Sequence, residues 1–235
     1  MVGGSGGIGR AVCRALAARG AAVVVHGGSS RARLDETLAE LRGLGTAAAA
    51  EGLLLPLRRP SDLLGRLEGL GRIDILVCAF GPFVRKRLVD TSAAEWETLA
   101  LLDLALPGAL CSALLPAMAS RGWGRMLLFG GTRTDAIRSY ASNAAYAAAK
   151  TGLAVLAKSL AAEGAGSGVG CLLVCPGLVE TEYLGEAERS KLQEKAPRGR
   201  LLTPEEIAET AVGLLAAEPC VASGAVLNLD GGLAL

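Results

Sequence analysis

Tyr146 and Lys150 are the pair of residues in this chain whose types and spacing are best suited to chemistry. They enclose three alanines, and an alanine-rich run without β-branched residues favours a helix. Side chains four residues apart on a helix lie on the same face. A phenol has a pKa of about 10, and a neighbouring ammonium lowers that pKa because it favours the phenolate. The pair is therefore suited to exchange a proton with an alcohol or carbonyl oxygen, although a surface helix carrying one Tyr and one Lys has the same spacing.

A glycine-rich segment, residues 2–9, precedes a helical pattern from Arg10 to Arg19. Glycines at a strand-to-helix turn let the backbone approach a phosphate, and the helix N-terminus favours its negative charge. An apolar run at 21–25 and a helical pattern at 31–44 follow. These elements predict a βαβ unit with its glycines at a phosphate-binding turn, rather than a flexible glycine-rich tail.

The strand expected before this glycine turn has only Met1 and Val2 to form it. A strand commonly has about five residues. The sequence leaves two explanations open. Either the start is truncated or misassigned, or another segment of the chain fills the gap in the sheet.

The end of the second expected strand indicates which dinucleotide would bind. An acid at this point binds the ribose hydroxyls of NAD, whereas a basic residue accommodates the extra phosphate of NADP. No acid is present, and His26 is followed closely by Ser29, Ser30 and Arg31. Two hydroxyls and a guanidinium suit a phosphate, so we expect NADPH, with NAD less favoured. One of the serines would also cap the following helix.

Strands and helices alternate along the rest of the chain. Apolar strands are expected at 52–57, 73–78, 125–129, 169–174 and 226–229, and helices after Pro60, at about 91–120, at 144–163 and after Thr203. This alternation predicts an α/β fold, a doubly wound parallel sheet with helices on both faces. We expect residues 1–235 to form a single domain.

Composition narrows the class of protein. The net charge of +1 gives no sign of a surface for nucleic acid or membrane, and the longest apolar runs are interrupted well short of a membrane span. We see no basic segment followed by a cleavable apolar one, so no secretion signal is expected. Cys171 and Cys175 could suggest a metal site, but the chain has one His, so buried reduced thiols and no metal are expected. These features are typical of a soluble cytoplasmic protein.

The order of these motifs resembles the short-chain dehydrogenase/reductase family over nearly the whole chain. The opening resembles the family's T-G-x-x-x-G-x-G cofactor loop, with Gly3, Gly7 and Gly9 at the glycine positions and Val2 where Thr is usual. The pair described above matches the family's Y-x-x-x-K motif. The segments GRLLTPEEIAETAVGLL and GAVLNLDGG are similar to those of 3-oxoacyl-carrier-protein reductases.

The resemblance implies a Rossmann-like fold and a mechanism. Tyr146 would exchange the proton with the substrate oxygen, Lys150 would lower the Tyr pKa and bind the ribose hydroxyls, and the nicotinamide would carry the hydride. The P-G segment, here Pro176 and Gly177, would cover the nicotinamide. The cofactor-binding residues that we expect are Gly3, Ser5, Gly7, Ile8, Gly9, Ser29, Ser30, Arg31, Ala79, Gly81, Tyr146, Lys150, Pro176, Gly177, Val179 and Thr181.

The hydroxyl that holds the substrate carbonyl is the first departure from the family. The family Ser is usually thirteen residues before the Tyr, which is Arg133 here. Counting from the strand start instead gives Gly131, as if about two residues were inserted. Thr132 is our first choice for the missing hydroxyl, and Thr134 is the second.

Two further departures concern asparagines. The family's Asn in the preceding helix, which supports a proton-relay water, is Asp103 here. A carboxylate can hold a water, but its charge can also pair with Lys150 and so offset the effect by which Lys150 lowers the pKa of Tyr146. The family's N-N-A-G becomes residues 78–81, Cys-Ala-Phe-Gly, so the amide contacts are lost.

Two functions remain in view. The first is an NADPH-dependent carbonyl reductase acting on a 3-oxoacyl thioester or another small ketone, and the second is a non-catalytic or weakly active dinucleotide-binding scaffold.

The charged segment 182–197, where the family places its substrate lid, is expected to be a solvated helix. The basic run 85–87 could attract an acidic carrier protein but is more often just solvated. The family commonly forms dimers and tetramers, and the long helices at 93–120 and 144–163 would permit a homodimer or homotetramer.

Overall fold

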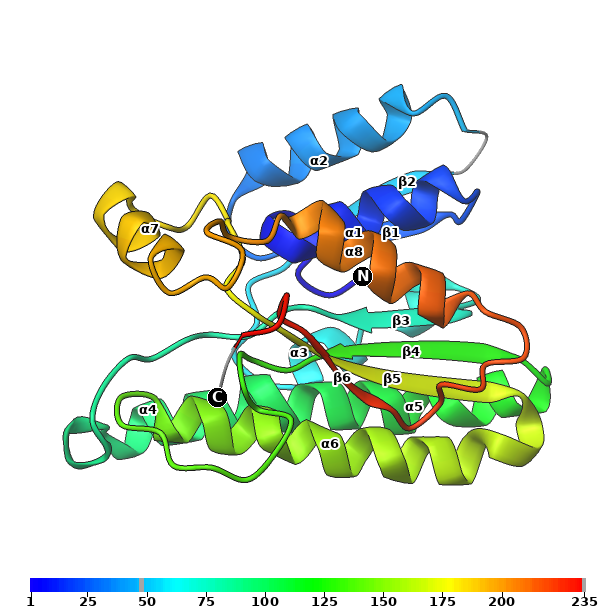
Figure 1. Ribbon diagram of the computed structural model, residues 1–235. Helices are drawn as coiled ribbons and strands as arrows, with labels where there is room; N and C mark the ends of the chain where they lie inside the picture. Colours follow the sequence, from blue (N-terminus) through cyan, green and yellow to red (C-terminus); the bar gives the residue numbers. More distant parts are fainter. Residues whose placement is uncertain (47–48, 234–235) are drawn as a thin grey trace.

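The structure is a computed structural model, and it describes residues 1–46 and 49–233. Strands and helices alternate as expected (Figure 1). In chain order they are α1 (Gly7–Ala18), β1 (Val23–Gly27), α2 (Arg31–Gly43), β2 (Ala50–Leu54), α3 (Ser61–Leu64), β3 (Ile75–Cys78), α4 (Ala93–Leu99), α5 (Leu106–Ser120), β4 (Gly124–Phe129), α6 (Ala144–Gly164), β5 (Val169–Pro176), α7 (Glu186–Gln193), α8 (Pro204–Leu215) and β6 (Val226–Leu229).

All strand pairs are parallel, but the sheet is divided into a β1–β2 pair and a four-stranded part, β3–β4–β5–β6. Met1 and Val2 lie between the two parts. The Met1 carbonyl accepts from His26 N–H at 2.9 Å, and Val2 N–H donates to the Val77 carbonyl at 2.8 Å. The expected first strand is therefore reduced to this bridge. Within 1–46 and 49–233, no other segment takes its place, so the idea that another segment fills the gap is wrong for that part of the chain.

The strands that follow Met1 and Val2 are added first on one side of this bridge and then on the other. From Met1 it runs through α1 to β1 and β2, and it then crosses back to β3 on the far side of the bridge. The strand order therefore reverses at the glycine turn. Open parallel sheets bind ligands at such a reversal, beyond the carboxyl ends of the strands.

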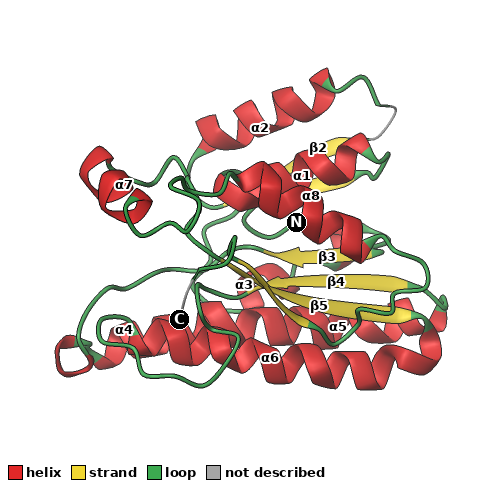
Figure 2. Ribbon diagram, in the orientation of Figure 1, coloured by secondary structure: helices red, strands yellow, loops and turns green. Residues whose placement is uncertain are grey.

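Helices cover both faces of the sheet (Figure 2). The helices α1, α2 and α8 pack on one face, where Leu127 and Phe129 of β4 point. The helices α5 and α6 pack on the other face, where Met126 and Leu128 point. Successive side chains of a strand alternate between faces, so this central strand is apolar throughout because both of its faces are buried.

Two helix starts follow the expected capping pattern. Ser92 accepts from Glu95 N–H, and the Glu95 carboxylate accepts from Ser92 N–H in return. Thr203 and Glu206 form the same reciprocal pair before α8. Such boxes satisfy N–H groups that a helix start leaves without partners.

The helical run 93–120 is continuous. A π-helical turn, Ala100–Ala105, joins α4 to α5, and Pro107 follows it directly. Proline cannot donate a helical hydrogen bond, and π turns are often found at functional sites. Among the described helices this run alone is long and apolar enough to cross a membrane, by length and composition only. Asp103, Pro107 and Gly108 interrupt the apolar run of this helix, and Leu106, Leu110 and Met118 are buried against the sheet.

Candidate active site

A pocket of about 200 Å³ lies at the carboxyl ends of the strands. The start of α1, the ends of β3, β4 and β5, and the first two turns of α6 all contribute to its wall. Its lining residues are Ile8, Ala79, Phe80, Gly81, Phe129, Gly130, Gly131, Thr132, Tyr146, Lys150 and Pro176. Most of the residues that the sequence predicts around a nicotinamide and a substrate carbonyl are therefore in one place.

Tyr146 and Lys150 lie on the buried side of α6. The Lys150 ammonium donates to the Phe129 carbonyl at 3.1 Å and lies 5.8 Å from the centre of the Tyr146 ring. Phe83 approaches the same ring edge-on, with 4.9 Å between ring centres. The helical spacing therefore places phenol and ammonium together at the pocket, as expected.

Asp103 is completely buried and faces Lys150 across 3.1 Å. Neither of its oxygens accepts an aligned hydrogen bond from a described residue, so the two groups interact as a charge pair. Gly81 makes room for the carboxylate, because a Cβ at that position would collide with Asp103 Oδ1. Burial raises the pKa of Asp103 to about 6 although the Lys150 charge opposes the shift.

Gly131 lies directly against the Tyr146 phenol. A Cβ on Gly131 would be 2.7 Å from Tyr146 Cε1 and 2.9 Å from its hydroxyl. Counting from the strand start therefore gives a position in contact with the phenol, and the tyrosine ring fills the space that a side chain there would need.

Thr132 and Thr134 have different surroundings in the turn after β4. Thr132 lines the pocket, and its hydroxyl donates to the Gly177 carbonyl at 3.2 Å. The buried Thr134 hydroxyl accepts from Gly131 N–H at 2.8 Å and lies 3.0 Å from the Gly131 carbonyl. Between them Arg133 has a φ of 65°, in the left-handed region. Because its hydroxyl closes this turn, Thr134 is a poor second choice for the substrate hydroxyl.

The glycine turn before α1 is closely packed. Gly3 has a φ of +78°, and a Cβ on Gly9 would collide with the Gly3 carbonyl. The buried His26 holds the turn, because its Nδ1 accepts from Gly3 N–H at 3.2 Å and its Nε2 lies 2.8 Å from the Leu55 carbonyl. These contacts require the neutral ring with its proton on Nε2, and burial lowers the pKa of His26.

A carboxylate occupies the N-terminus of α1. Gly7 N–H donates to both oxygens of Glu182, at 2.9 Å and 3.1 Å. Helix N-termini favour negative charge and bind phosphates in the same way. This contact shows that the glycine turn accepts an anion.

The residues expected to read the ribose phosphate lie outside the pocket. Ser30 caps α2 by accepting from Arg33 N–H at 3.4 Å. Arg31 is exposed and 3.9 Å from Asp35, and the exposed Ser29 precedes it. Ser5 lies beside the end of β1, since a Cβ on Gly27 would be 3.3 Å from its hydroxyl oxygen.

The remaining predicted residues follow β5. Gly177 N–H donates to the Leu229 carbonyl at 3.0 Å, and Val179 bridges to Leu202. Thr181 lies beside the glycine turn, because a Cβ on Gly7 would be 3.5 Å from its methyl group. The segment after β5 therefore runs from the pocket back to the start of α1.

Comparison with known proteins identifies the family. A family model described as Enoyl-(Acyl carrier protein) reductase matches residues 3–234. The reductase FabG of Escherichia coli (strain K12), named as a 3-oxoacyl-(acyl-carrier-protein) reductase, is 32% identical over 243 residues, which cover 99% of this chain and 95% of the relative. The chain belongs to the short-chain dehydrogenase/reductase family.

Other relatives and solved structures are also similar to this chain over most of its length. The short-chain reductase protein NovJ of Streptomyces niveus is 34% identical over 249 residues, covering 99% of this chain and 92% of the relative. A crystal structure of a 3-oxoacyl (acyl-carrier-protein) reductase from Agrobacterium tumefaciens C58 with NADP bound has a TM-score of 0.86 at 27% identity, covering 98% of this chain and 92% of that one. The TT0495 protein of Thermus thermophilus has a TM-score of 0.85 at 34% identity, covering 99% of this chain and 96% of that one. These likenesses confirm the α/β fold with its parallel sheet.

In this short-chain dehydrogenase/reductase the pKa of Tyr146 is raised, whereas the sequence predicts that Lys150 lowers it. Burial is the largest cause, and the negative charge of Asp103 is the next. The expectation of a lowered pKa is wrong for this arrangement, because burial of the phenol and, second to it, the charge of Asp103 both raise the pKa of Tyr146. The alternative noted from the sequence, that Asp103 pairs with Lys150, is what the geometry shows.

Asp103→Asn is expected to lower the pKa of Tyr146 by about one unit or more. The substitution keeps the shape of the side chain, removes a negative charge near the phenol and leaves the charge of Lys150 unpaired. The chain has three tyrosines, so the ultraviolet absorbance of the phenolate, titrated with and without Tyr146→Phe, isolates this one. Asp90→Asn, which disrupts an exposed pair with Arg87, is the control. An unchanged titration of Tyr146 in Asp103→Asn would contradict the prediction.

Sequence reasoning missed three contributors to this site. Glu182, whose carboxylate binds Gly7 N–H at the start of α1, is one. His26, the only histidine in the sequence, is another. Arg33 is the third, since its guanidinium lies 5.3 Å from the centre of the Tyr183 ring beside the glycine turn. A lone histidine at the end of an expected strand and an acid next to a predicted cofactor residue were the signals available in the sequence. Among the described residues, no group of three or more acids, histidines and cysteines is arranged to hold a metal.

Proposed function

We propose that this protein reduces a small ketone or 3-oxoacyl thioester to an alcohol with NADPH, and that Tyr146 is the proton donor. One observation carries the proposal. The wall of a single pocket contains Tyr146, Lys150, the first turn of α1 and the Pro176 segment. A scaffold that had lost its chemistry would have no need to keep this pair together at the carboxyl ends of the strands.

The residues around the pocket fit a dinucleotide. The glycine turn and Gly7 N–H already hold a carboxylate, so they would bind the diphosphate once Glu182 moves away. Pro176 and Ala79 line the pocket where the nicotinamide would lie. When bound, the cofactor supplies the hydride.

The protein's own side chains would handle the proton. Tyr146 donates it to the carbonyl oxygen, and its raised pKa keeps the phenol protonated at neutral pH. Lys150, held by Asp103 and the Phe129 carbonyl, places a positive charge beside the phenolate that forms. Thr132 rotates its hydroxyl away from the Gly177 carbonyl and donates to the same substrate oxygen.

Three features support NADPH over NADH. No acid follows β1, and Ser29, Ser30 and Arg31 stand where a phosphate would lie. The reductase from Agrobacterium tumefaciens C58 was solved with NADP bound. Among the described residues, Arg31 pairs with Asp35 alone, through a long and exposed contact, so its guanidinium can turn to a ligand.

Arg31→Ala is expected to weaken NADPH binding about 10- to 150-fold and to change NADH binding little. A hydrogen bond to a charged group contributes about 1.5–3 kcal/mol, which corresponds to that range. Titration calorimetry with each cofactor measures it, and Arg42→Ala at the other end of α2 is the control. Equal loss for both cofactors would mean that Arg31 does not bind the phosphate.

The basic run 85–87 gives less support for a carrier-protein partner. Arg85 is 3.3 Å from Glu188 of α7, Lys86 pairs with Glu95, and Arg87 pairs with Asp90. These pairs partly neutralise the run, so the proposal of a carrier-linked substrate is supported by the named relatives alone.

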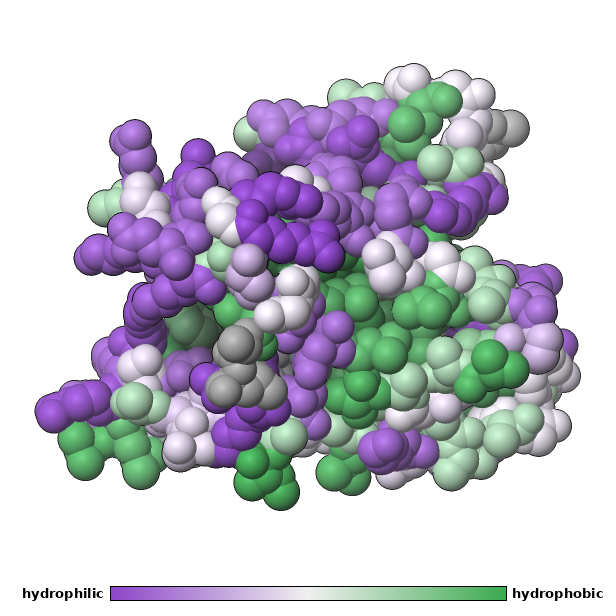
Figure 3. All heavy atoms as spheres, viewed as in Figure 1, coloured by the Kyte–Doolittle hydropathy of each residue, from purple (hydrophilic) through white to green (hydrophobic). Residues whose placement is uncertain are grey.

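The polar α7, purple in Figure 3, fits the expected solvated lid, since all but one of its residues are exposed.

The proposal also includes a cytoplasmic location and a homodimer or homotetramer. Exposed apolar residues on the long helices, Leu101 of the π turn and Val155 of α6, would fit an interface between copies. A single domain remains our prediction for the whole chain.

The test is NADPH oxidation with a panel of ketones, acetoacetyl thioester and a 2-enoyl thioester. We expect oxidation with at least one ketone or 3-oxoacyl substrate. Oxidation of NADPH with the enoyl substrate alone would show that the protein reduces a carbon–carbon double bond and not a carbonyl group. Tight binding of NADPH without oxidation of any substrate would favour the scaffold.

A further inference from the structure

A short turn of the chain, Thr181–Leu184, lies against the start of α1. The amide of its last residue donates to the carbonyl of its first at 3.1 Å, so Glu182 and Tyr183 stand at the tip of the turn. Gly7 N–H donates to both oxygens of Glu182, at 2.9 Å and 3.1 Å. A carboxylate of the protein itself therefore binds where a helix N-terminus would bind a phosphate.

Tyr183 covers the residue that precedes α1. A Cβ on Gly6 would collide with the Tyr183 hydroxyl and with Glu182 Oε1, so only a glycine leaves room for this contact. The Arg33 guanidinium of α2 lies over the Tyr183 ring, 5.3 Å from its centre, and a cation is attracted to an aromatic face. Both side chains at the tip of the turn are exposed, so the turn can move away without opening the core.

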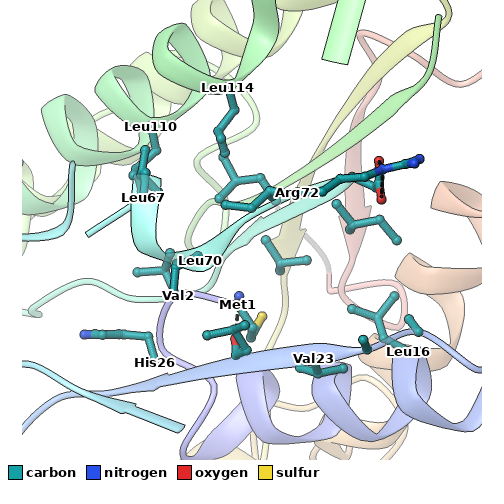
Figure 4. A pocket seen from close by; sticks show the side chains of 18 of the residues that line it. Met1, Val2, Leu16, Val23, His26, Leu67, Leu70, Arg72, Leu110 and Leu114 are labelled. Atoms are coloured by element: carbon teal, nitrogen blue, oxygen red, sulfur yellow. Dashed lines mark hydrogen bonds and ion pairs between the residues drawn. The ribbon is translucent and has the colours of Figure 1, made fainter. Parts of the chain in front are cut away.

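The glycine turn, in contrast, is held from the inside and does not depend on Glu182. The His26 ring accepts from Gly3 N–H at 3.2 Å, and the Met1 nitrogen donates to the Val24 carbonyl at 2.9 Å. Met1 and His26 line a cavity of about 410 Å³ next to β1 (Figure 4). The anion site at the start of α1 would therefore keep its shape when the carboxylate leaves.

We propose that Glu182 competes with the cofactor for the start of α1, and that a dinucleotide binds only after it displaces the turn Thr181–Leu184. The inference rests on the proposed function, because the displacing anion is the diphosphate of the cofactor. A site that is open in only a fraction of the molecules binds its ligand more weakly by that fraction. Since NADPH, NADH and ADP all contain a diphosphate, the competition weakens the binding of all three equally. The phosphate contact proposed for Arg31 would instead affect NADPH alone.

Glu182→Gln keeps the length of the side chain and removes its charge. We expect it to tighten the binding of NADPH, NADH and ADP alike, by about 3- to 30-fold, as removal of an anion from a helix N-terminus allows. Titration calorimetry with each ligand measures the change. Glu180→Gln is the control, because it removes the same charge two residues away, from an exposed pair with Arg189 at 3.3 Å. The control should change the three affinities less than about twofold.

Gly6→Ala tests the same contact from the side of the helix. Gly6 has an extended backbone, with a φ of −177° and a ψ of 169°, which alanine adopts without strain. Its methyl group would push against Glu182 and Tyr183 at the ends of their flexible side chains and would leave the backbone donors in place. We expect Gly6→Ala to tighten ADP binding, and the double variant with Glu182→Gln to add little to either single change.

Unchanged or weaker ADP binding by Glu182→Gln would overturn the inference. Equal tightening by Glu180→Gln would also overturn it, because net charge would then suffice, and so would tightening confined to NADPH. Should Glu182→Gln fail to fold, Gly6→Ala decides, since unchanged or weaker ADP binding by that variant refutes the competition. Equal NADPH binding with and without Glu182→Gln would refute the competition and leave the proposed function standing. The absence of NADPH binding in every one of these proteins would refute both.

Discussion

Tyr146→Phe is expected to lower the turnover of ketone reduction by about 10²–10⁴-fold, the usual contribution of a general acid. Phenylalanine keeps the ring that packs against Phe83 and Gly131 and removes only the hydroxyl. Cofactor affinity should therefore stay close to that of the unaltered protein. Steady-state kinetics with NADPH and the best ketone of the panel, together with NADPH titration, measures both quantities.

Tyr140→Phe is the matched control for this result. The Tyr140 hydroxyl donates to the Arg133 carbonyl and does not line the pocket, so this variant should keep most of its turnover. Wild-type turnover in Tyr146→Phe would show that the proton comes from another group. Loss of NADPH binding in Tyr146→Phe would show that the hydroxyl serves the cofactor more than the substrate.

Thr132→Ala should reduce turnover by about 10²–10³-fold, because one donor to a developing oxyanion is typically worth that much. Thr132 is the hydroxyl residue that lines the pocket beside Tyr146 and Gly131. Its present contact with the Gly177 carbonyl, at 3.2 Å, is long for a hydroxyl donor. A substrate carbonyl can therefore replace that acceptor at small cost.

Thr132→Ser separates catalysis from local structure in the same experiment. Serine keeps the donor, so most of the turnover should return. Thr98→Ala is the control, because that hydroxyl bonds the Ala94 carbonyl on the exposed side of α4. Thr134→Ala is unsuitable as a control, since it would open the turn at Gly131. Little change in Thr132→Ala would mean that Tyr146 alone holds the substrate oxygen.

The pH dependence of stability should reflect two buried groups with opposite effects. The lowered pKa of His26 means that the unfolded chain binds more protons than the folded one as the pH falls through about 6.5, so stability is lost there. The raised pKa of Asp103, about 6, has the opposite sign. The folded chain takes up that proton first, so this group adds stability as the pH falls from about 6 towards its unfolded value.

Local pattern was enough to predict the elements and the main pair of the site. The spacing of Tyr146 and Lys150 places them on one helix face whatever surrounds the helix. The caps at Ser92 and Thr203 involve residues three apart, so the sequence shows both partners. The apolar runs of β1, β3, β4 and β5 became mostly buried parallel strands because helices cover both faces of the sheet, whereas the edge strands β2 and β6 are partly exposed.

Tertiary structure alone decided how charge is arranged around that pair. Asp103 and Lys150 belong to different helices, and their closeness depends on how α6 packs against the π turn. Glu182 reaches Gly7 across 175 residues, and no periodicity in the sequence predicts that contact. Short-range spacing fixes which side chains share an element, whereas the pKa of Tyr146 depends on burial and on a charge delivered by a different part of the chain.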